Sequence, residues 1–239
     1  MKKGILALLV VAACWGPTLQ ANDWKNAPIS EVQKAAEQSD AKAQFLLGSM
    51  YVQGKGVAQD DKQAVTWFRK AAEQGDAKAQ GLLGIMYVQG KGVAQDDKQA
   101  VTWFRKAAEQ GDATAQYLMG MAYEDGRGVA QDDKQAVAWF RKAAELGHAD
   151  AQTKLGLMYD DGRGVAQDDK QAVTWFRKAA EQGDAKAQSM LGSMYVQGKG
   201  VAQDYKQAAT WFRKAAEQGN AQAQRLLGMM YDIGVGVVQ

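Results

Sequence analysis

The chain has very little of the side chains that catalysis and metal binding use most. Its 239 residues include a single cysteine, Cys14, and a single histidine, His148. A zinc site needs several Cys or His ligands, and nucleophilic catalysis usually needs a Ser or Cys beside a base. From this inventory we expect no metal ion, no cofactor and no catalytic residue.

The chain also has a small net charge and few prolines. Without residues 1–21, which hold Lys2 and Lys3 and no acid, basic and acidic residues number 27 each. A neutral chain lacks the basic surface that a phosphate backbone requires, so we expect no nucleic-acid partner. With 46% apolar residues, 26 glycines and two prolines, the composition excludes disordered and collagen-like classes.

Residues 1–21 have the pattern of a bacterial targeting segment. Lys2 and Lys3 precede an apolar stretch, residues 5–13, that is too short to span a bilayer. We expect cleavage after Ala21. Two alternatives stay open: lipidation at Cys14, because residues 11–14 resemble a lipoprotein box, and a retained membrane helix. Cleavage after Ala21 predicts an exported protein that is periplasmic or secreted. Lipidation at Cys14 predicts an outer-membrane lipoprotein whose lipid is its membrane contact.

The rest of the chain is built on an internal repeat. Five units of 36 residues cover 40–219, with a half-unit before them (22–39) and another after them (220–239). A period of this length without alternating polarity predicts an α-solenoid. The tryptophans that mark the period are Trp67, Trp103, Trp139, Trp175 and Trp211.

Each unit is expected to hold two helices, as residues 76–111 illustrate. Asp76 is a good N-cap for a first helix, and Gly90 is suited to the left-handed C-cap that would end it. Asp96 then begins a second helix, and Gly111 ends it. Apolar residues follow the helical spacing in both segments. The fold class is therefore predicted to be all-α, with about twelve helices.

The half-units at the two ends should behave differently from the repeats. Segment 22–39 matches a second helix with Glu31 in place of the tryptophan, which gives it the more polar face of a capping element. Segment 220–239 matches a first helix without a partner helix. Its apolar side is a candidate contact for self-association, and a frayed end without a role is the alternative.

Short strings that recur in every unit resemble the Sel1-like repeat, a longer relative of the tetratricopeptide repeat. The resemblance runs from about residue 22 to residue 239. It implies a right-handed α/α superhelix that acts as an adaptor, binding a protein or peptide on its concave face in the cell envelope or in host contact. In one unit the strings are Asp76-Ala-Lys-Ala-Gln80, Leu83-Gly84, Met86-Tyr87, Gly90-x-Gly92-Val93 and Ala107-Ala108.

One cysteine-rich branch of that family has been linked to β-lactam binding and hydrolysis. Its members carry a disulfide in each repeat, and this chain has none. Ser39 and Lys42 match the S-x-x-K string of penicillin-recognising enzymes, but the S-D-N and K-T-G elements are absent. His148 stands where other units have a capping Asp, which favours a substituted cap over a general base. We predict a non-enzymatic scaffold, with a β-lactam-binding or hydrolysing enzyme as the alternative.

The copies differ mainly on one face of the first helix. Four positions at i, i+3, i+7 and i+10 vary from repeat to repeat, whereas the exposed residues of the second helix hardly change. One of the four series reads Val52, Val88, Glu124, Asp160, Val196 and Asp232.

We interpret the variable face as the wall of a groove that binds a protein or peptide, because aromatic, Met and Arg side chains are typical of binding hot spots. Drift on a solvated face is the alternative. The residues predicted to contact a partner are Lys42, Phe45, Ser49, Lys78, Ile85, Thr114, Tyr117, Met121, Asp150, Thr153, Leu157, Lys186, Ser189, Ser193, Arg225 and Met229.

Overall fold

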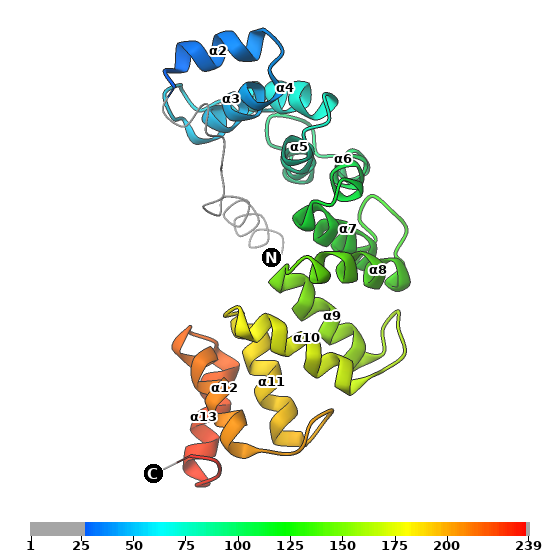
Figure 1. Ribbon diagram of the computed structural model, residues 1–239, viewed down its shortest axis with the longest axis vertical. Coiled ribbons are helices and arrows are strands. Elements are labelled where there is room, and N and C mark those ends of the chain that lie inside the picture. The colour runs from blue at the N-terminus through cyan, green and yellow to red at the C-terminus, as the bar shows by residue number, and fades with distance from the viewer. Residues whose placement is uncertain (1–26, 238–239) are drawn as a thin grey trace. The chain divides into compact units, whose positions relative to one another are not determined.

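The computed structural model describes residues 27–237, and within this range the chain forms twelve α-helices and no strand (Figure 1). The predicted all-α class is therefore confirmed. Cleavage after Ala21 and lipidation of Cys14 concern residues outside the described range. No helix of the described part is long and apolar enough to cross a membrane.

The chain divides into two compact units, each built from consecutive helices that pack on one another. The first unit contains the described residues up to 122 together with 126–130, and the second contains 123–125 and the residues from 131 onward. The helices are α2 (Ile29–Glu37), α3 (Ala41–Gln53), α4 (Asp61–Glu73), α5 (Ala77–Gln89), α6 (Asp97–Glu109), α7 (Ala113–Asp125), α8 (Asp133–Glu145), α9 (Ala149–Asp161), α10 (Asp169–Glu181), α11 (Ala185–Gln197), α12 (Tyr205–Glu217) and α13 (Ala221–Asp232).

Two helix types alternate along the chain, and local capping sets their ends. The A helices are α3, α5, α7, α9, α11 and α13, and the B helices are α2, α4, α6, α8, α10 and α12. Asp76 caps α5 by accepting a hydrogen bond from the Ala79 backbone N–H at 2.7 Å, and Gly90 ends that helix at a φ of 65°. His148 caps α9 through Nδ1, which accepts from the Ala151 N–H at 3.3 Å. The interpretation of His148 as a substituted cap is confirmed.

The core forms where a B helix lies between two A helices. The α4 helix packs against α3 and α5, and its Phe68 is 1% exposed. Phe68 clusters with Ala79 and Leu83 of α5, while Trp103 of the following B helix joins the same cluster. Each repeat thus supplies part of the core of the repeat before it, as expected for a solenoid.

Buried glutamines connect an A helix both to the B helix before it and, in most repeats, to the B helix of its own repeat. The Gln80 side chain, 4% exposed, donates to the Ala72 carbonyl at 3.0 Å, and its own oxygen accepts from Gln110 Nε2 at 2.8 Å. The same bond joins Gln74 to Gln44, Gln182 to Gln152 and Gln218 to Gln188. At Gln116 the oxygen is buried without a partner, and the sequence has Leu146 where the other copies have the donor glutamine.

We expect Gln182→Leu to lower the free energy of unfolding by about 1–3 kcal/mol, because it leaves the buried Gln152 oxygen without a donor. Urea-induced unfolding followed by circular dichroism measures the loss. Gln171→Leu on the same helix is the control: Gln171 is exposed, so its substitution should change the free energy by less than about 0.5 kcal/mol. Equal effects of the two substitutions would contradict a stabilising role for the Gln182–Gln152 bond.

Candidate functional site

The residues predicted to contact a partner fall into three groups by burial. The exposed group is Lys42, Lys78, Asp150, Lys186, Arg225 and Met229. The half-buried group is Phe45, Thr114, Tyr117, Met121, Leu157 and Ser193. The buried group is Ser49, Ile85, Thr153 and Ser189.

The buried group corrects the predicted groove wall. Thr153 is 4% exposed, and its hydroxyl donates to the capping carboxylate of Asp184, at the start of the next A helix, at 3.1 Å. At the same position of an earlier repeat, the Phe45 ring lies against the Phe68 ring, with the two ring centroids 5.9 Å apart. This position faces a neighbouring helix, so its variation reflects how each junction is packed. The prediction that Ser49, Ile85, Thr153 and Ser189 line an open wall is wrong.

A second variable position forms ion pairs between repeats in the second unit. The Glu124 side chain, 12% exposed, accepts from Lys154 Nζ at 2.6 Å and also from Arg163. Burial alone would raise the pKa of Glu124, but the hydrogen bonds and positive charges of Lys154 and Arg163 outweigh it and lower that pKa. Glu124 is therefore held as a carboxylate that joins its own repeat to the next one.

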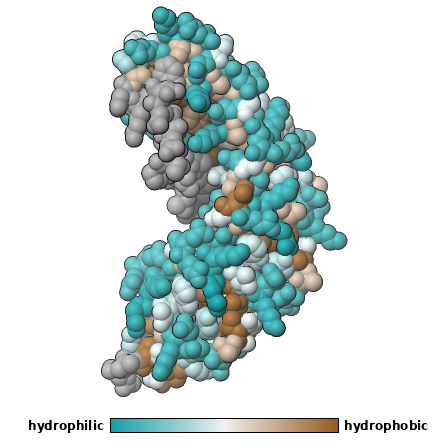
Figure 2. All heavy atoms as spheres, viewed as in Figure 1, coloured by the Kyte–Doolittle hydropathy of each residue, from teal (hydrophilic) through white to brown (hydrophobic). Residues whose placement is uncertain are grey.

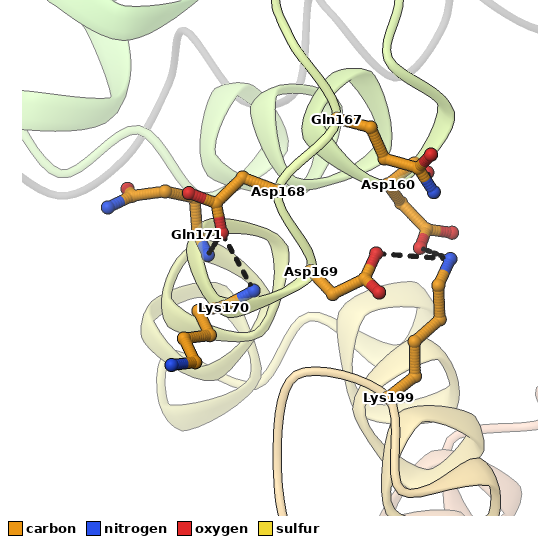
Figure 3. A network of polar contacts seen from close by, with 7 residues as sticks. All are labelled: Asp160, Gln167, Asp168, Asp169, Lys170, Gln171 and Lys199. Carbon is orange, nitrogen blue, oxygen red and sulfur yellow. Dashed lines mark hydrogen bonds and ion pairs between the residues drawn. The ribbon is translucent and has the colours of Figure 1, made fainter.

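The next repeat has a similar contact, shown in Figure 3. Lys199 hydrogen bonds to Asp160, and its Nζ lies 3.3 Å from Asp169 at the start of α10. The hydrogen bond with Asp160 raises the pKa of Lys199 against the opposing effect of burial. The neighbouring Asp168 has a separate role, because its carboxylate caps α10 by accepting from the backbone N–H groups of Lys170 and Gln171.

In the first unit, the place that corresponds to the Glu124–Lys154 ion pair is an apolar pocket. Val52, Leu82 and Lys91 stand 72 residues before Glu124, Lys154 and Arg163, so the first unit has two aliphatic residues where the second has an ion pair. We call this cavity the unit 1 pocket. It is lined by Val52, Asp61, Phe68, Leu82, Ile85, Met86, Gln89 and Lys91.

The repeated sequence matches one family over most of its length. The Sel1 repeat model matches residues 41–76, 77–112, 113–148, 149–184, 185–220 and 221–239. The chain belongs to the Sel1 repeat family. The resemblance seen in the recurring strings is thereby confirmed.

Solved structures agree with this assignment. A protective antigen of uropathogenic Escherichia coli with an SLR fold, c5321, is 45% identical, with a TM-score of 0.84 over 86% of this chain and 44% of that one. This chain thus spans less than half of the antigen's length. A Sel1 repeat protein from Oxalobacter formigenes is 36% identical, with a TM-score of 0.77 over 90% and 92% of the two chains. A Klebsiella pneumoniae Sel1 repeat protein is 26% identical, with a TM-score of 0.52 over 86% and 100%. No curated protein matches this sequence.

Several residues that the structure of this Sel1 repeat chain brings together lie outside the set predicted from the sequence. Val52, Leu82, Met86 and Lys91 line the unit 1 pocket but were not among the predicted contacts, whereas Ile85 was. A usable signal was present in the copies. The position of Lys154 is apolar in every other copy, and it becomes basic in the copy that follows Glu124. Two positions that change together from apolar residues to opposite charges are expected to be in contact.

The lowered pKa of Glu124 predicts how acid affects the second unit. A carboxyl group with a lower pKa in the folded chain stabilises it above the unfolded pKa of about 4.3, and this stabilisation is lost as the pH falls through the folded value. We expect Glu124→Gln to lower the free energy of unfolding at pH 7 by about 1–3 kcal/mol. It should also weaken the pH dependence between about pH 3 and pH 5.

Chemical denaturation across that pH range measures both effects. Glu109→Gln is the control, because Glu109 is an exposed glutamate at the end of α6. The control variant should keep the pH dependence of the parent protein. A Glu124→Gln variant with an unchanged pH profile would show that the Lys154 and Arg163 contacts do not stabilise the fold.

Proposed function

We propose that this chain is an exported, non-enzymatic scaffold that binds a peptide or protein segment along the exposed face of its A helices, in the cell envelope or in contact with a host. Sel1 repeat solenoids generally bind proteins, which supports a protein partner. Capped, closely packed helices present their side chains rigidly, so the partner bears most of the ordering cost on binding.

One observation carries the proposal: the exposed residues of the B helices hardly change between copies, whereas those of the A helices vary. Lys62, Arg69 and Glu73 of α4 recur in all five units. The exposed A-helix position reads Lys42, Lys78, Asp150, Lys186 and Gln222 in five copies, with a half-buried Thr114 between them. A sequence of different charges along one face can distinguish partners, whereas a repeated pattern cannot.

The surface in view in Figure 2 is mostly hydrophilic, with apolar residues in small separate patches. Such a surface suits recognition by a few anchoring side chains combined with polar contacts better than a broad apolar interface. A peptide or an exposed protein segment fits this description.

Site-specific photo-crosslinking in intact bacteria tests the proposal. A photoreactive residue at position 78, exposed on the A helix α5, should give a discrete adduct with another protein. The same residue at position 102, exposed on the B helix α6, is the matched control and should give none. The captured protein should then bind the purified chain more weakly when Lys78→Glu is introduced. Identical adducts from both positions would contradict binding along the A helices.

Two further measurements test the remaining parts of the proposal. Mass spectrometry of the mature N-terminus distinguishes cleavage after Ala21 from lipidation at Cys14, and an uncleaved chain would contradict export by either route. Nitrocefin hydrolysis by the purified protein should not exceed that of a denatured control. Turnover above that control would contradict a purely non-enzymatic role.

A further inference from the structure

Basic residues in the loops after the A helices are paired with carboxylates in most repeats. Arg127 contacts Asp97 at 2.9 Å in the first unit. In the second unit Arg163 contacts Glu124, and Lys199 contacts Asp160 and Asp169. The acids at 124 and 160 come from the variable position of the preceding A helix. A loop cation in these repeats therefore has at least one carboxylate partner.

Within the described residues, two of the five loop cations at this position, Lys55 and Lys91, form no ion pair, and Lys91 is the one that lines the unit 1 pocket. The variable position that provides Glu124 to Arg163 is here Val52. Lys91 is exposed and lines the unit 1 pocket, so a carboxylate from outside the chain could reach it.

The interior of the unit 1 pocket is apolar. Phe68 is 1% exposed and Met86 is 5% exposed, and Val52, Leu82 and Ile85 complete the aliphatic lining. The charged lining residues are Asp61 and Lys91. An apolar side chain placed in this pocket would be buried against these aliphatic residues, which removes apolar surface from water.

We propose that the unit 1 pocket binds one apolar side chain of a partner peptide, and that an Asp or Glu next to it in the peptide pairs with Lys91. The inference rests on the proposed function and narrows it to one anchoring site. The partner's carboxylate takes the place that Glu124 has beside Arg163, and its apolar side chain contacts the aliphatic residues that replace the Glu124–Lys154 pair.

Asp61 does not prevent this pairing. Its counterpart Asp169 lies 3.3 Å from Lys199 while the same lysine also bonds to Asp160. A loop lysine of this fold can thus serve two carboxylates at once. Lys91, which forms no ion pair with Asp61, can therefore pair with a partner's carboxylate even though Asp61 also lines the pocket.

The chain itself offers a substitution that closes the site without disturbing the fold. Val52→Glu combined with Leu82→Lys gives the first unit the charged pair that the second unit already carries beside Arg163. The converse variant, Glu124→Val with Lys154→Leu, is the matched control, because it changes the same two positions in the second unit and leaves the unit 1 pocket intact. Circular dichroism and thermal unfolding verify that both variants remain helical.

The probe is a phage-displayed library of short random peptides selected on the full chain, with enriched peptides then synthesised and their affinities measured. We expect the enriched sequences to carry an apolar residue next to Asp or Glu. They should lose about tenfold or more in affinity for the Val52→Glu/Leu82→Lys variant and for Lys91→Gln, and keep their affinity for the control variant.

Two outcomes would overturn the inference in different ways. Enriched peptides that bind the Val52→Glu/Leu82→Lys variant as tightly as the parent protein would overturn the pocket as the anchoring site and leave the proposed scaffold function standing. A library that yields no binder, together with no adduct from position 78 in cells, would overturn both.

Discussion

Replacing Gly92 with alanine is expected to lower the free energy of unfolding by about 3 kcal/mol or more, since it combines backbone strain with a steric clash. Gly92 has a φ of 68°, and a Cβ there would lie 2.1 Å from the Asp61 carbonyl oxygen and 2.4 Å from its carbonyl carbon. These are backbone atoms at the start of α4, which Asp60 holds in place by capping the helix. The loop or the helix would have to move.

Gly111→Ala separates the two costs. Gly111 has a φ of 88°, but a Cβ there would have no atom within 4 Å, so the variant should lose only about 1–2 kcal/mol from the left-handed backbone conformation. Urea-induced unfolding of both variants at one temperature gives the difference. Equal losses would show that close contact between the Gly92 loop and α4 does not stabilise the repeat.

The same contact recurs in later repeats. A Cβ on Gly128, Gly164 or Gly200 would lie 2.1–2.2 Å from the carbonyl oxygen of Asp97, Asp133 or Asp169. The ion pairs of Arg127 and Lys199 lie beside this contact, since each cation immediately precedes one of these glycines and reaches the same aspartate. Backbone approach and charge pairing thus fix the loop of one repeat on the B helix of the repeat before it.

Helix positions could be predicted from the sequence because capping is local. Asp76 and Gly90 predict the two ends of one helix, and the structure has α5 between them, from Ala77 to Gln89. The N-cap bond spans three residues, and the left-handed glycine needs no distant partner. Five nearly identical copies repeat the same signals, so the number of helices and the fold class follow from one unit.

The faces of the A helices could not be assigned in the same way. An A helix is covered both by B helices and by the next A helix, so buried residues occur on several of its sides. In α5, Ala79 and Leu83 contact the core of α4, while Ile85 lines the unit 1 pocket. A helical wheel shows which residues share a face but not which neighbour covers that face, and Thr153 was misassigned for this reason.

Glycine in an A helix illustrates the same limit. The Leu83-Gly84 string was recognisable as part of the family pattern, yet propensity alone describes Gly84 as a weak point in a helix. Its reason lies in tertiary structure. A Cβ at Gly84 would be 2.5 Å from Cε1 and 2.6 Å from Cδ1 of the Phe104 ring, and 3.1 Å from the Ala100 carbonyl oxygen.

Gly84→Ala is accordingly expected to destabilise the chain by about 1–3 kcal/mol despite the better helix propensity of alanine. The Phe104 ring cannot move aside easily, because it is 4% exposed within the core of its repeat. Gly81→Ala, three residues earlier on the same helix, is the matched control: no atom lies within 4 Å of a Cβ there, so alanine should stabilise the chain by up to about 1 kcal/mol. The two variants make the same chemical change in one helix and should shift the thermal midpoint in opposite directions. If both raised it, the close packing of A-helix glycines against B-helix phenylalanines would not be what sets the distance between the helices of a repeat.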